Sequence, residues 1–440
     1  MLVKVQIANQ QGTMPFNPVP QLTTAHTGPL FPVEALIVKE VAKIESWFRQ
    51  AWQVAPPPLM SSVDLRHAGF KLAPVDTNLF PGGFNNLNTD FMPLCVQAVQ
   101  STLGSRYQRL LLLPENHTRN QHYLQSLRVL RDIFITAGYD VRIGHLQENV
   151  QACIDLPLDS GELLRLEPLV RRGSRIGLAD YEPCMLVLNN DLSSGVPSLL
   201  QDIEQRIEPV AELGWMTRLK SQHFAYYDAV VEEFAQLLQM DPWLINPMHV
   251  AVDGLDFMAK TGIERLAEEV DRVLQRIQVV YQRYGITEKP YVVVKADKGT
   301  YGMGVMMIQD AQQLLDLNRK QRTNMAKTKG NQSVSRVMIQ EGVYSFETMP
   351  NGAVAEPVVY MMGPFVVGGF YRVHRELGTD DILNTPGMYF EPLAFANTCN
   401  MPAADNPSPD AMNRFYAYGV IARLAGLAAA REAAAIRKPL

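Results

Sequence analysis

The sequence predicts a mixed α/β (α+β) protein, in which a parallel sheet in the amino-terminal part is followed by a mainly β-stranded carboxy-terminal part. Three observations predict this fold class. A strand–helix–strand pattern occupies residues 109–144, a long amphipathic helix is expected at 263–284, and short β-branched runs alternate with polar loops over 292–374. A chain of 440 residues should form roughly two to three domains. We therefore expect two regions, residues 1–240 and 241–440.

The first region is expected to begin with a helix and a loop. Apolar residues at helical spacing predict a helix over residues 33–52, which ends before a run of three prolines. Residues 61–88 are rich in Pro, Gly and Asn and are expected to form a loop. A strand at 109–115, a helix at 123–138 and a strand at 139–144 then form a βαβ unit, which favours a parallel sheet.

A second strand with a polar loop is expected at residues 185–195, followed by a helix at 196–207. In open α/β sheets, loops of this kind at the carboxyl ends of strands are where ligands bind. Gly285 is the expected cap of the long helix at 263–284, and an Ala-rich helix is expected over 414–435.

Composition limits the classes of partner and the compartment. The net charge is −5, the pI is about 6.0, and no long run of Lys and Arg is present, which argues against nucleic acid as a partner. The amino terminus lacks a signal-like apolar core, and no window is long and apolar enough to span a membrane. We therefore expect a cytoplasmic protein without a membrane partner, and the sequence leaves open whether it forms a homo-oligomer.

The most informative segment is a lysine at the end of a β-branched strand, followed by a loop with three glycines. Lys295 ends the strand, and Lys298, Gly299, Gly302 and Gly304 follow it. Glycines let backbone N–H groups approach phosphate oxygens, and the lysines supply positive charge for the phosphates of a nucleotide. The segment lacks the G-K-[ST] of a Walker loop and does not open a helix as a dinucleotide fingerprint does. The alternative is a tight hairpin whose glycines only satisfy turn geometry.

A second strand, at residues 337–343, breaks into an acidic hinge that could bind the rest of a nucleotide. Backbone groups of the hinge residues Gln340, Glu341 and Val343 are the predicted contacts to adenine, and Glu347 is the predicted contact to the ribose. The alternative interpretation of Glu347 is a solvated acid in a loop.

The order of strand lysine, glycine loop, Gln-Glu hinge and later acid, arginine and asparagine resembles the ATP-grasp ligases. Together with the segment from Asp64 to Leu87, DLRHAGFKLAPVDTNLFPGGFNNL, it makes essentially the whole chain similar to the compact bacterial glutamate–cysteine ligases, the gamma-glutamylcysteine synthetases. The resemblance implies an ATP-grasp fold that uses ATP and Mg²⁺. It makes residues 1–240 the substrate-binding region and 241–440 the nucleotide-binding and catalytic region.

The activity that the resemblance implies joins the γ-carboxylate of glutamate to the amine of cysteine through a γ-glutamyl phosphate, the first step of glutathione biosynthesis. Phosphoryl transfer to a carboxylate gathers negative charge, so catalysis should come from positioning and electrostatic neutralisation. Lys295 and Arg372 are the predicted catalytic residues, because the Arg372 fork can steady the transferred phosphoryl group. By analogy with the family, Lys220 is a second phosphate contact; a solvated helix start is the alternative.

A magnesium ion between phosphates calls for hard oxygen ligands. Glu356, Asn384 and Glu391 are the candidates. ATP-grasp enzymes often place a Glu and an Asn two apart on one strand, whereas here Ile382 stands two residues before Asn384. The expected pair is therefore missing. The alternative for each acid is a surface or edge-strand charge.

An amino-acid substrate needs arginine for its carboxylate and acids or amides for its amine. Arg66 is the predicted carboxylate contact, and Asp76 or Asn78 the predicted amine contact. The full set of predicted substrate residues is Asp64, Arg66, Asp76, Asn78, Asn85 and Asn86. The alternative is that these Asp and Asn side chains cap turns between prolines and glycines.

Two other functions stay open from the sequence. One is a different ATP-grasp peptide or amide ligase, such as a glutathione synthetase-like enzyme, because the glycine loop and lysine are common to both. The other is a degenerate nucleotide-binding regulator, which the missing Glu-x-Asn pair allows. Residues 319–331 form a basic polar segment that is either a lid or a surface loop.

Overall fold

The computed structural model describes residues 20–22, 24–25, 28–116, 119–147, 150–299, 304–326, 333–393, 395–398 and 414–436. The helices are α1 (Pro32–Lys39), α2 (Val41–Val54), α3 (Met92–Leu103), α4 (Gln121–Thr136), α5 (Lys220–Leu238), α6 (Ile263–Tyr284), α7 (Gln312–Leu315), α8 (Arg319–Ala326) and α9 (Arg414–Ile436).

The strands of the first half are β1 (Pro20–Leu22), β2 (Met60–His67), β3 (Leu72–Asn78), β4 (Arg109–Pro114), β5 (Asp140–His145), β6 (Ile154–Pro157), β7 (Leu163–Pro168), β8 (Val170–Arg172), β9 (Arg175–Gly177), β10 (Met185–Asn189) and β11 (Arg206–Glu208). Those of the second half are β12 (His249–Asp253), β13 (Val292–Ala296), β14 (Val305–Ile308), β15 (Arg336–Glu341), β16 (Val354–Met362), β17 (Phe365–His374), β18 (Tyr389–Pro392) and β19 (Phe395–Thr398).

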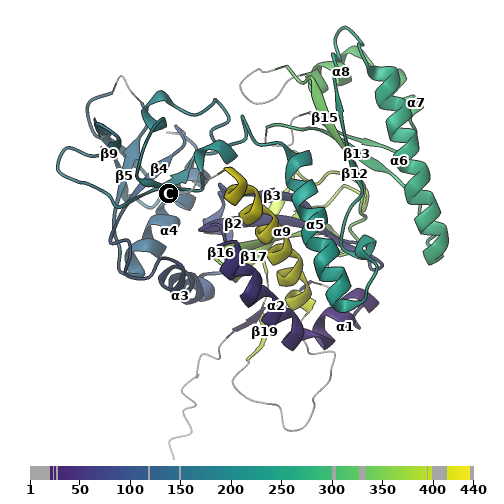
Figure 1. Cartoon of the computed structure of the whole chain (residues 1–440), viewed down its shortest axis with the longest axis horizontal. Helices are drawn as coiled ribbons and strands as arrows, with labels where there is room; N and C mark the ends of the chain where they lie inside the picture. The colour runs from purple at the N-terminus through teal and green to yellow at the C-terminus, as the bar shows by residue number, and fades with distance from the viewer. Residues whose placement is uncertain are drawn as a thin grey trace, which may run out of the picture.

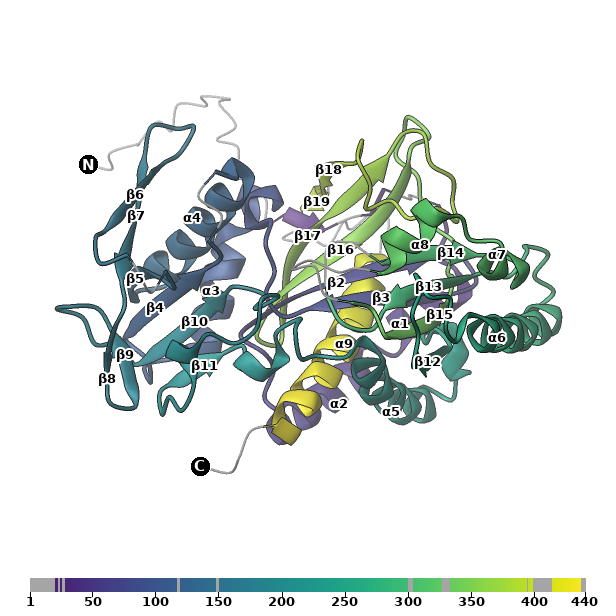
Figure 2. The same ribbon diagram turned by 90° about the horizontal axis from the view of Figure 1, so that it is seen from above.

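Three layers of structure follow one another across the molecule. In both views, the strands β4 and β5 lie at one side, β16, β17 and α9 in the middle, and β13, β15 and α6 at the other side (Figures 1 and 2). The fold class predicted from the sequence, mixed α/β with a parallel sheet in the amino-terminal part, is confirmed.

The first layer, which we call the parallel-sheet lobe, runs from α3 to β11. Its six strands have the order β11-β10-β4-β5-β7-β6, and every pair from β11 to β7 is parallel, whereas β6 is antiparallel to β7. The predicted βαβ unit is β4, α4 and β5. The strand β10 lies on the other side of β4 from β5, so the chain order reverses at the carboxyl ends of β4 and β10.

The middle layer is the central sheet, an antiparallel sheet of order β18-β17-β16-β2-β3. It pairs strands from both ends of the chain, so it crosses the predicted boundary at residue 240. The parallel-sheet lobe is inserted between β3 and α5.

The predicted loop at residues 61–88 is wrong over about half of its length, because β2 and β3 occupy it. In β2 the apolar Val63 and Leu65 belong to the core that includes α9, and they alternate with Asp64 and Arg66 on the other face. Pro74 is tolerated because β3 is the edge strand of the sheet. The turn-like composition hid a half-buried strand pair.

The third layer is the outer sheet, antiparallel with order β12-β15-β13-β14. The helix α6 has the predicted bounds, and its cap Gly285 adopts the left-handed φ of 67° that favours glycine. Apolar residues of α6 share one core with Val292, Val294 and Ala296 of β13. The alternate residues of β13, Val293 and Lys295, therefore face away from α6, toward the central sheet.

The Ala-rich helix α9 is confirmed and lies against the central sheet between α2 and α5 (Figure 1). It contacts α1, α5, β2, β3 and β16. Most of its residues are buried, including those between its apolar positions. Alanine and glycine therefore fit here, because small side chains let a central helix approach a sheet and several helices at once.

Other predicted helices differ from the structure. The segment 196–207 forms only a 3-10 turn at Ser198–Leu200 and then β11, which pairs with β10 in parallel. The predicted helix at 33–52 is two helices that break at Glu40. In the basic segment 319–331, α8 covers the first eight residues, and residues 327–331 lie outside the described part. In the part of the chain that the structure describes, no helix has the length and apolarity to cross a membrane.

One buried ion pair joins the end of α9 to the segment before α5. Arg218 Nε lies 3.0 Å from Glu432 Oε1, both side chains are 2% exposed, and Arg218 Nη1 donates to Thr77 O at 2.7 Å. Burial tends to raise the pKa of Glu432, but Arg218 and His223 outweigh burial and lower it to about 2. The pair therefore stabilises the fold fully at pH values above 4.5, the ordinary pKa of a glutamate. This contribution is lost as the pH falls from 4.5 toward 2.

We predict that Glu432→Gln lowers the free energy of unfolding at pH 7 by about 3–5 kcal/mol, because it leaves Arg218 buried without a carboxylate. Urea unfolding followed by tryptophan fluorescence measures this. The matched control is Glu233→Gln, which breaks the more exposed pair with Arg431 between α5 and α9 and should cost at most about 1 kcal/mol. Equal losses in the two variants would contradict the prediction.

Candidate functional site

Charged side chains gather on one face of the central sheet, which we call the polar face. Asp64 of β2 is paired directly with Asp76 of β3, and Glu356 of β16 with Arg372 of β17. Directly paired residues of antiparallel strands project to the same face. Arg66 follows Asp64 by two residues and shares its face. Four strands therefore bring five of the predicted site residues together.

The two arginines of the polar face are held by its acids. Arg372 Nη1 lies 3.0 Å from Asp64 Oδ2 and 3.4 Å from Glu356 Oε2. Arg66 pairs with the other oxygen of Glu356 and donates to Tyr291 OH at 2.8 Å. Burial raises the pKa of Asp64; Arg372 opposes the rise, and Asp76 and Glu356 add to it. The acids are thus crowded enough to favour a further cation.

Two lysines approach this face from other elements. Lys295 of β13 donates to Val75 O at 2.8 Å, and Lys220 at the start of α5 lies 3.9 Å from Asp76 Oδ1. Burial alone would raise the pKa of Asp76, but Lys220, Lys295 and Arg218 outweigh it and lower the pKa. Burial also lowers the pKa of Lys295 to about 8, with Lys220 adding to the fall and Asp76 opposing it. Two ammonium groups therefore share one carboxylate in a buried site.

Lys220 is also tied to the glycine loop. Its ammonium donates to Gly299 O at 2.8 Å and lies 3.7 Å from the centre of the Trp215 ring. Gly299 and Gly304 have left-handed φ angles of 93° and 63°, so both positions favour glycine. Lys298 is exposed, and Gly302 lies outside the described residues.

Of the predicted hinge residues Gln340 and Val343, only Gln340 lies on the same face of the outer sheet as Lys295. Gln340 pairs with Val293 in the outer sheet and so shares the face of Lys295. Its Nε2 atom is buried with no hydrogen-bond partner within the described part of the chain. Val343 O, in contrast, accepts bonds from Arg66 and Tyr291.

The two hinge acids are already engaged. The Glu341 carboxylate accepts from Lys71 Nζ at 2.8 Å, Trp243 Nε1 at 3.0 Å and Met248 N at 2.9 Å. Glu347 is 2% exposed and accepts from Tyr371 and from Tyr418. Neither the ribose contact nor the solvated loop acid expected for Glu347 describes this buried group.

The three predicted metal ligands are not brought together. Glu391 is paired with Tyr371, so it lies on the opposite face of the sheet from Glu356 and Arg372. Asn384 is exposed between β17 and β18. The described residues contain no group of three or more His, Cys, Asp or Glu side chains placed to hold a metal ion.

The predicted substrate asparagines take part in local turns. Asn78 accepts from Phe80 N at 2.9 Å and so closes a turn, which is the alternative that the sequence left open. Asn85 and Asn86 form a 3-10 turn with Phe84.

Comparison with known proteins decides the family. The model of a family described as GshA, glutamate-cysteine ligase, matches residues 34–433. The chain belongs to the glutamate–cysteine ligase family. A solved structure from Methylobacillus flagellatus, a proposed gamma-glutamylcysteine synthetase, is 51% identical and superposes with a TM-score of 0.83, covering 96% of this chain and 100% of that one.

Two further solved structures are distant. A glutathione synthetase-like effector from Globodera pallida is 11% identical with a TM-score of 0.35, covering 81% of this chain and 79% of that one. A D-alanyl-alanine synthetase A from Vibrio cholerae is 10% identical with a TM-score of 0.28, covering 59% and 69%. Likeness at this level establishes nothing about the fold. No curated protein matches the chain.

The family match spans every residue of the polar face and both lysines. Three site residues escaped the sequence interpretation: Tyr291, Trp215 and Asp297. Asp297 stands between Lys295 and the glycine loop in the stretch KADKG and is fully buried. Its position between the two lysines of a proposed phosphate-binding loop could have marked Asp297 as a site residue in the sequence.

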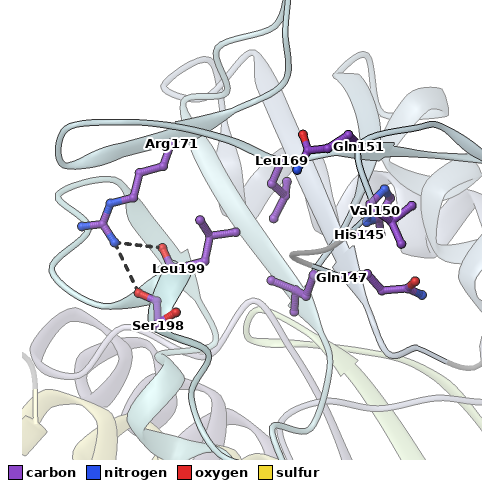
Figure 3. A pocket seen from close by; sticks show the side chains of 9 residues that line it. His145, Gln147, Val150, Gln151, Leu169, Arg171, Ser198 and Leu199 are labelled. Carbon is purple, nitrogen blue, oxygen red and sulfur yellow. Dashed lines mark hydrogen bonds between the residues drawn. The ribbon is translucent and has the colours of Figure 1, made fainter.

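A cavity of about 510 Å³ lies in the parallel-sheet lobe, outside the charged cluster (Figure 3). It is next to the carboxyl end of β5, and Arg171 at its rim donates to Ser198 O and Leu199 O at 3.3 Å each. Its lining residues are His145, Leu146, Gln147, Val150, Gln151, Leu169, Arg171, Ser198 and Leu199. None of the predicted site residues lines it, so we assign the chemistry to the polar face.

We predict that Lys295 titrates with a pKa of about 8 in the free protein, below the ordinary value of 10.5. Because Asp76 favours the charged lysine, Asp76→Asn should lower this pKa further. ¹³C NMR of labelled lysine side chains measures both values, with Lys295→Arg to assign the signal. A signal that titrates near 10.5 and ignores the Asp76 substitution would contradict the geometry.

Proposed function

We propose that this ligase uses ATP and Mg²⁺ to join the γ-carboxylate of L-glutamate to the amine of L-cysteine through a γ-glutamyl phosphate. The observation that carries the proposal is the convergence of Lys295 and Lys220, from two separate elements, on a sheet face that already holds Arg372. Three cations of this kind can neutralise a transferring phosphoryl group. The proposed partners are small molecules, glutamate and cysteine.

The nucleotide is proposed to bind between the central and outer sheets. Both lysines donate to backbone carbonyls, Val75 O and Gly299 O, and phosphate oxygens are stronger acceptors than these. The glycine loop begins at the same point, at Gly299, and its backbone N–H groups are proposed as further phosphate contacts. The unpartnered Gln340 amide, on the face of Lys295, is our preferred side-chain contact to the base.

The acids of the polar face fit a magnesium ion. Mg²⁺ is usually held by one or two carboxylates together with phosphates and water. Glu356 and Asp64 are neighbours around Arg372. Burial, together with the nearby Asp76 and Glu356 carboxylates, raises the pKa of Asp64, and a bound cation would favour its charged form. When bound, the ion would offset the charge of the phosphates. Glu356 thus remains our proposed ligand, now with Asp64 in place of Glu391, which lies on the opposite face of the sheet, and of the exposed Asn384.

The guanidinium groups of Arg66 and Arg372 are proposed to bind the two other anions, the α-carboxylate of glutamate and the acyl-phosphate. Arg66 is proposed for the α-carboxylate of glutamate, with Asp76 for its amine. Arg372 is proposed to hold the acyl-phosphate, so that the amine of cysteine attacks the acyl carbon and phosphate leaves. In the free protein both arginines are balanced by Asp64 and Glu356, so substrate anions must compete with these acids for the guanidinium groups.

We predict that Lys295→Ala lowers kcat/KM for ATP by about 10²–10³-fold, because it removes a preorganised charge from the phosphates. The assay follows release of ADP and phosphate in the presence of glutamate, cysteine and Mg²⁺. Lys43→Ala, on an exposed helix face, is the matched control and should turn over normally. Normal turnover of Lys295→Ala would remove the assignment.

The amine acceptor is tested in the same assay. Wild type should release phosphate with glutamate and cysteine, and not with γ-glutamylcysteine and glycine. The opposite preference would identify a glutathione synthetase-like enzyme. The absence of turnover with any pair of amino acids would identify a nucleotide-binding regulator.

A further inference from the structure

Asp297 is a fully buried carboxylate that the proposed chemistry does not use. It follows β13 directly, two residues after Lys295, at the base of the glycine loop. Its Oδ1 accepts from Ser221 N at 2.7 Å, and its Oδ2 accepts from Ser221 Oγ at 2.6 Å and from Arg336 Nε at 2.5 Å. Three donors from two other elements therefore fix its side chain.

The same place is tied by the backbone. Lys220 N donates to Asp297 O at 2.9 Å, and Gly299 N donates to Trp215 O at 3.0 Å. Lys220 Nζ returns to Gly299 O at 2.8 Å. The start of the glycine loop and the start of α5 are thus joined through Asp297, Lys220 and Gly299.

The helix α5 needs this acid. Its own N-cap residue is Leu219, which makes no side-chain cap. The first N–H groups of a helix have no partner within the helix and are normally bonded by an Asp, Asn, Ser or Thr at the cap. Asp297, which is 76 positions away in sequence, supplies that bond to Ser221 N. The first residue of the helix is Lys220, so the cap also sets where the Lys220 stem leaves the backbone.

We propose that Asp297 is a positioning residue of the nucleotide site: by capping α5 from the base of the glycine loop, it holds Lys220 at a fixed place relative to Lys295 and to the loop. This inference rests on the proposed function, in which both lysines bind the phosphates of ATP. Asp297 is too deeply buried to touch the nucleotide and acts through Lys220.

The test is a double-mutant cycle on the KM for ATP. Asp297→Ala should raise this KM by about tenfold or more, because the lost charge-assisted bonds release Lys220, and it should leave the KM for glutamate and for cysteine unchanged. In the Lys220→Ala background, the same substitution should change the KM for ATP by less than about twofold, because the residue through which it acts is gone.

Two more variants keep the test decisive. Asp253→Asn is the matched control, because Asp253 also pairs with Arg336, at 2.8 Å, but its side chain is largely exposed, and Asp297, not Asp253, caps α5. Its KM for ATP should equal that of wild type. Asp297→Asn keeps an acceptor for Ser221 N, so its KM for ATP should lie between those of wild type and Asp297→Ala. This variant replaces Asp297→Ala in the test if the alanine variant does not fold.

The outcomes separate this inference from the proposed function. An Asp297→Ala protein that raises all three KM values, or that shows the same effect with and without Lys220, would reduce Asp297 to a structural role and overturn the inference. If instead wild type releases no phosphate from ATP, or Lys295→Ala turns over normally, the proposed function itself fails.

Discussion

The site depends on keeping opposite charges together where two antiparallel sheets meet. Lys295 and Lys220 are less than a tenth exposed, and a buried lysine without a carboxylate nearby would lose its proton. Asp76 supplies that carboxylate for both. On the neighbouring strands, the Asp64 and Glu356 carboxylates balance the positive charges of Arg66 and Arg372. The protein therefore holds its phosphate-binding cations ready in the absence of phosphate, at the cost of lowered lysine pKa values.

The rest of the fold maintains this arrangement. The helix α9 fills the apolar face of the central sheet, and its end holds Arg218, just before Lys220, through Glu432. The outer sheet brings Lys295, and Asp297 fixes the start of α5 to it. The parallel-sheet lobe reaches the same place through its loop after β10, where Trp215 N donates to Asp191 O at 2.8 Å. All three layers thus contribute to the position of Lys220.

Much of the fold and of the charged cluster could be predicted from the sequence. The bounds of α6 followed from its amphipathic periodicity and those of α9 from its alanine content. Lys295, Arg372, Glu356 and Arg66 followed from residue type and neighbours. Two strands at residues 60–78 could not be predicted, because their Pro, Gly and Asn content resembles a loop and β16, the long-range partner of β2, lies about 300 residues away.

The sequence failed where a long-range contact decides a side chain's role. Glu347 follows the hinge closely in sequence, which suggested a contact to the ribose. In the structure it accepts hydrogen bonds from Tyr371 and Tyr418, and Tyr371 lies on the face of the central sheet opposite to Arg372. Glu391 is one residue out of phase with the polar face, which only the pairing with β17 reveals. Asp297 was missed for the same reason, since the helix that it caps begins 77 positions earlier in the chain.

A crystal structure with Mg²⁺ and a non-hydrolysable ATP analogue tests the central claim most directly. Our account predicts that the analogue's phosphates lie between the central and outer sheets, with the ammonium groups of Lys295 and Lys220 moved from Val75 O and Gly299 O onto phosphate oxygens. A nucleotide bound elsewhere, such as in the cavity beside His145, with both lysines still on those carbonyls, would contradict it.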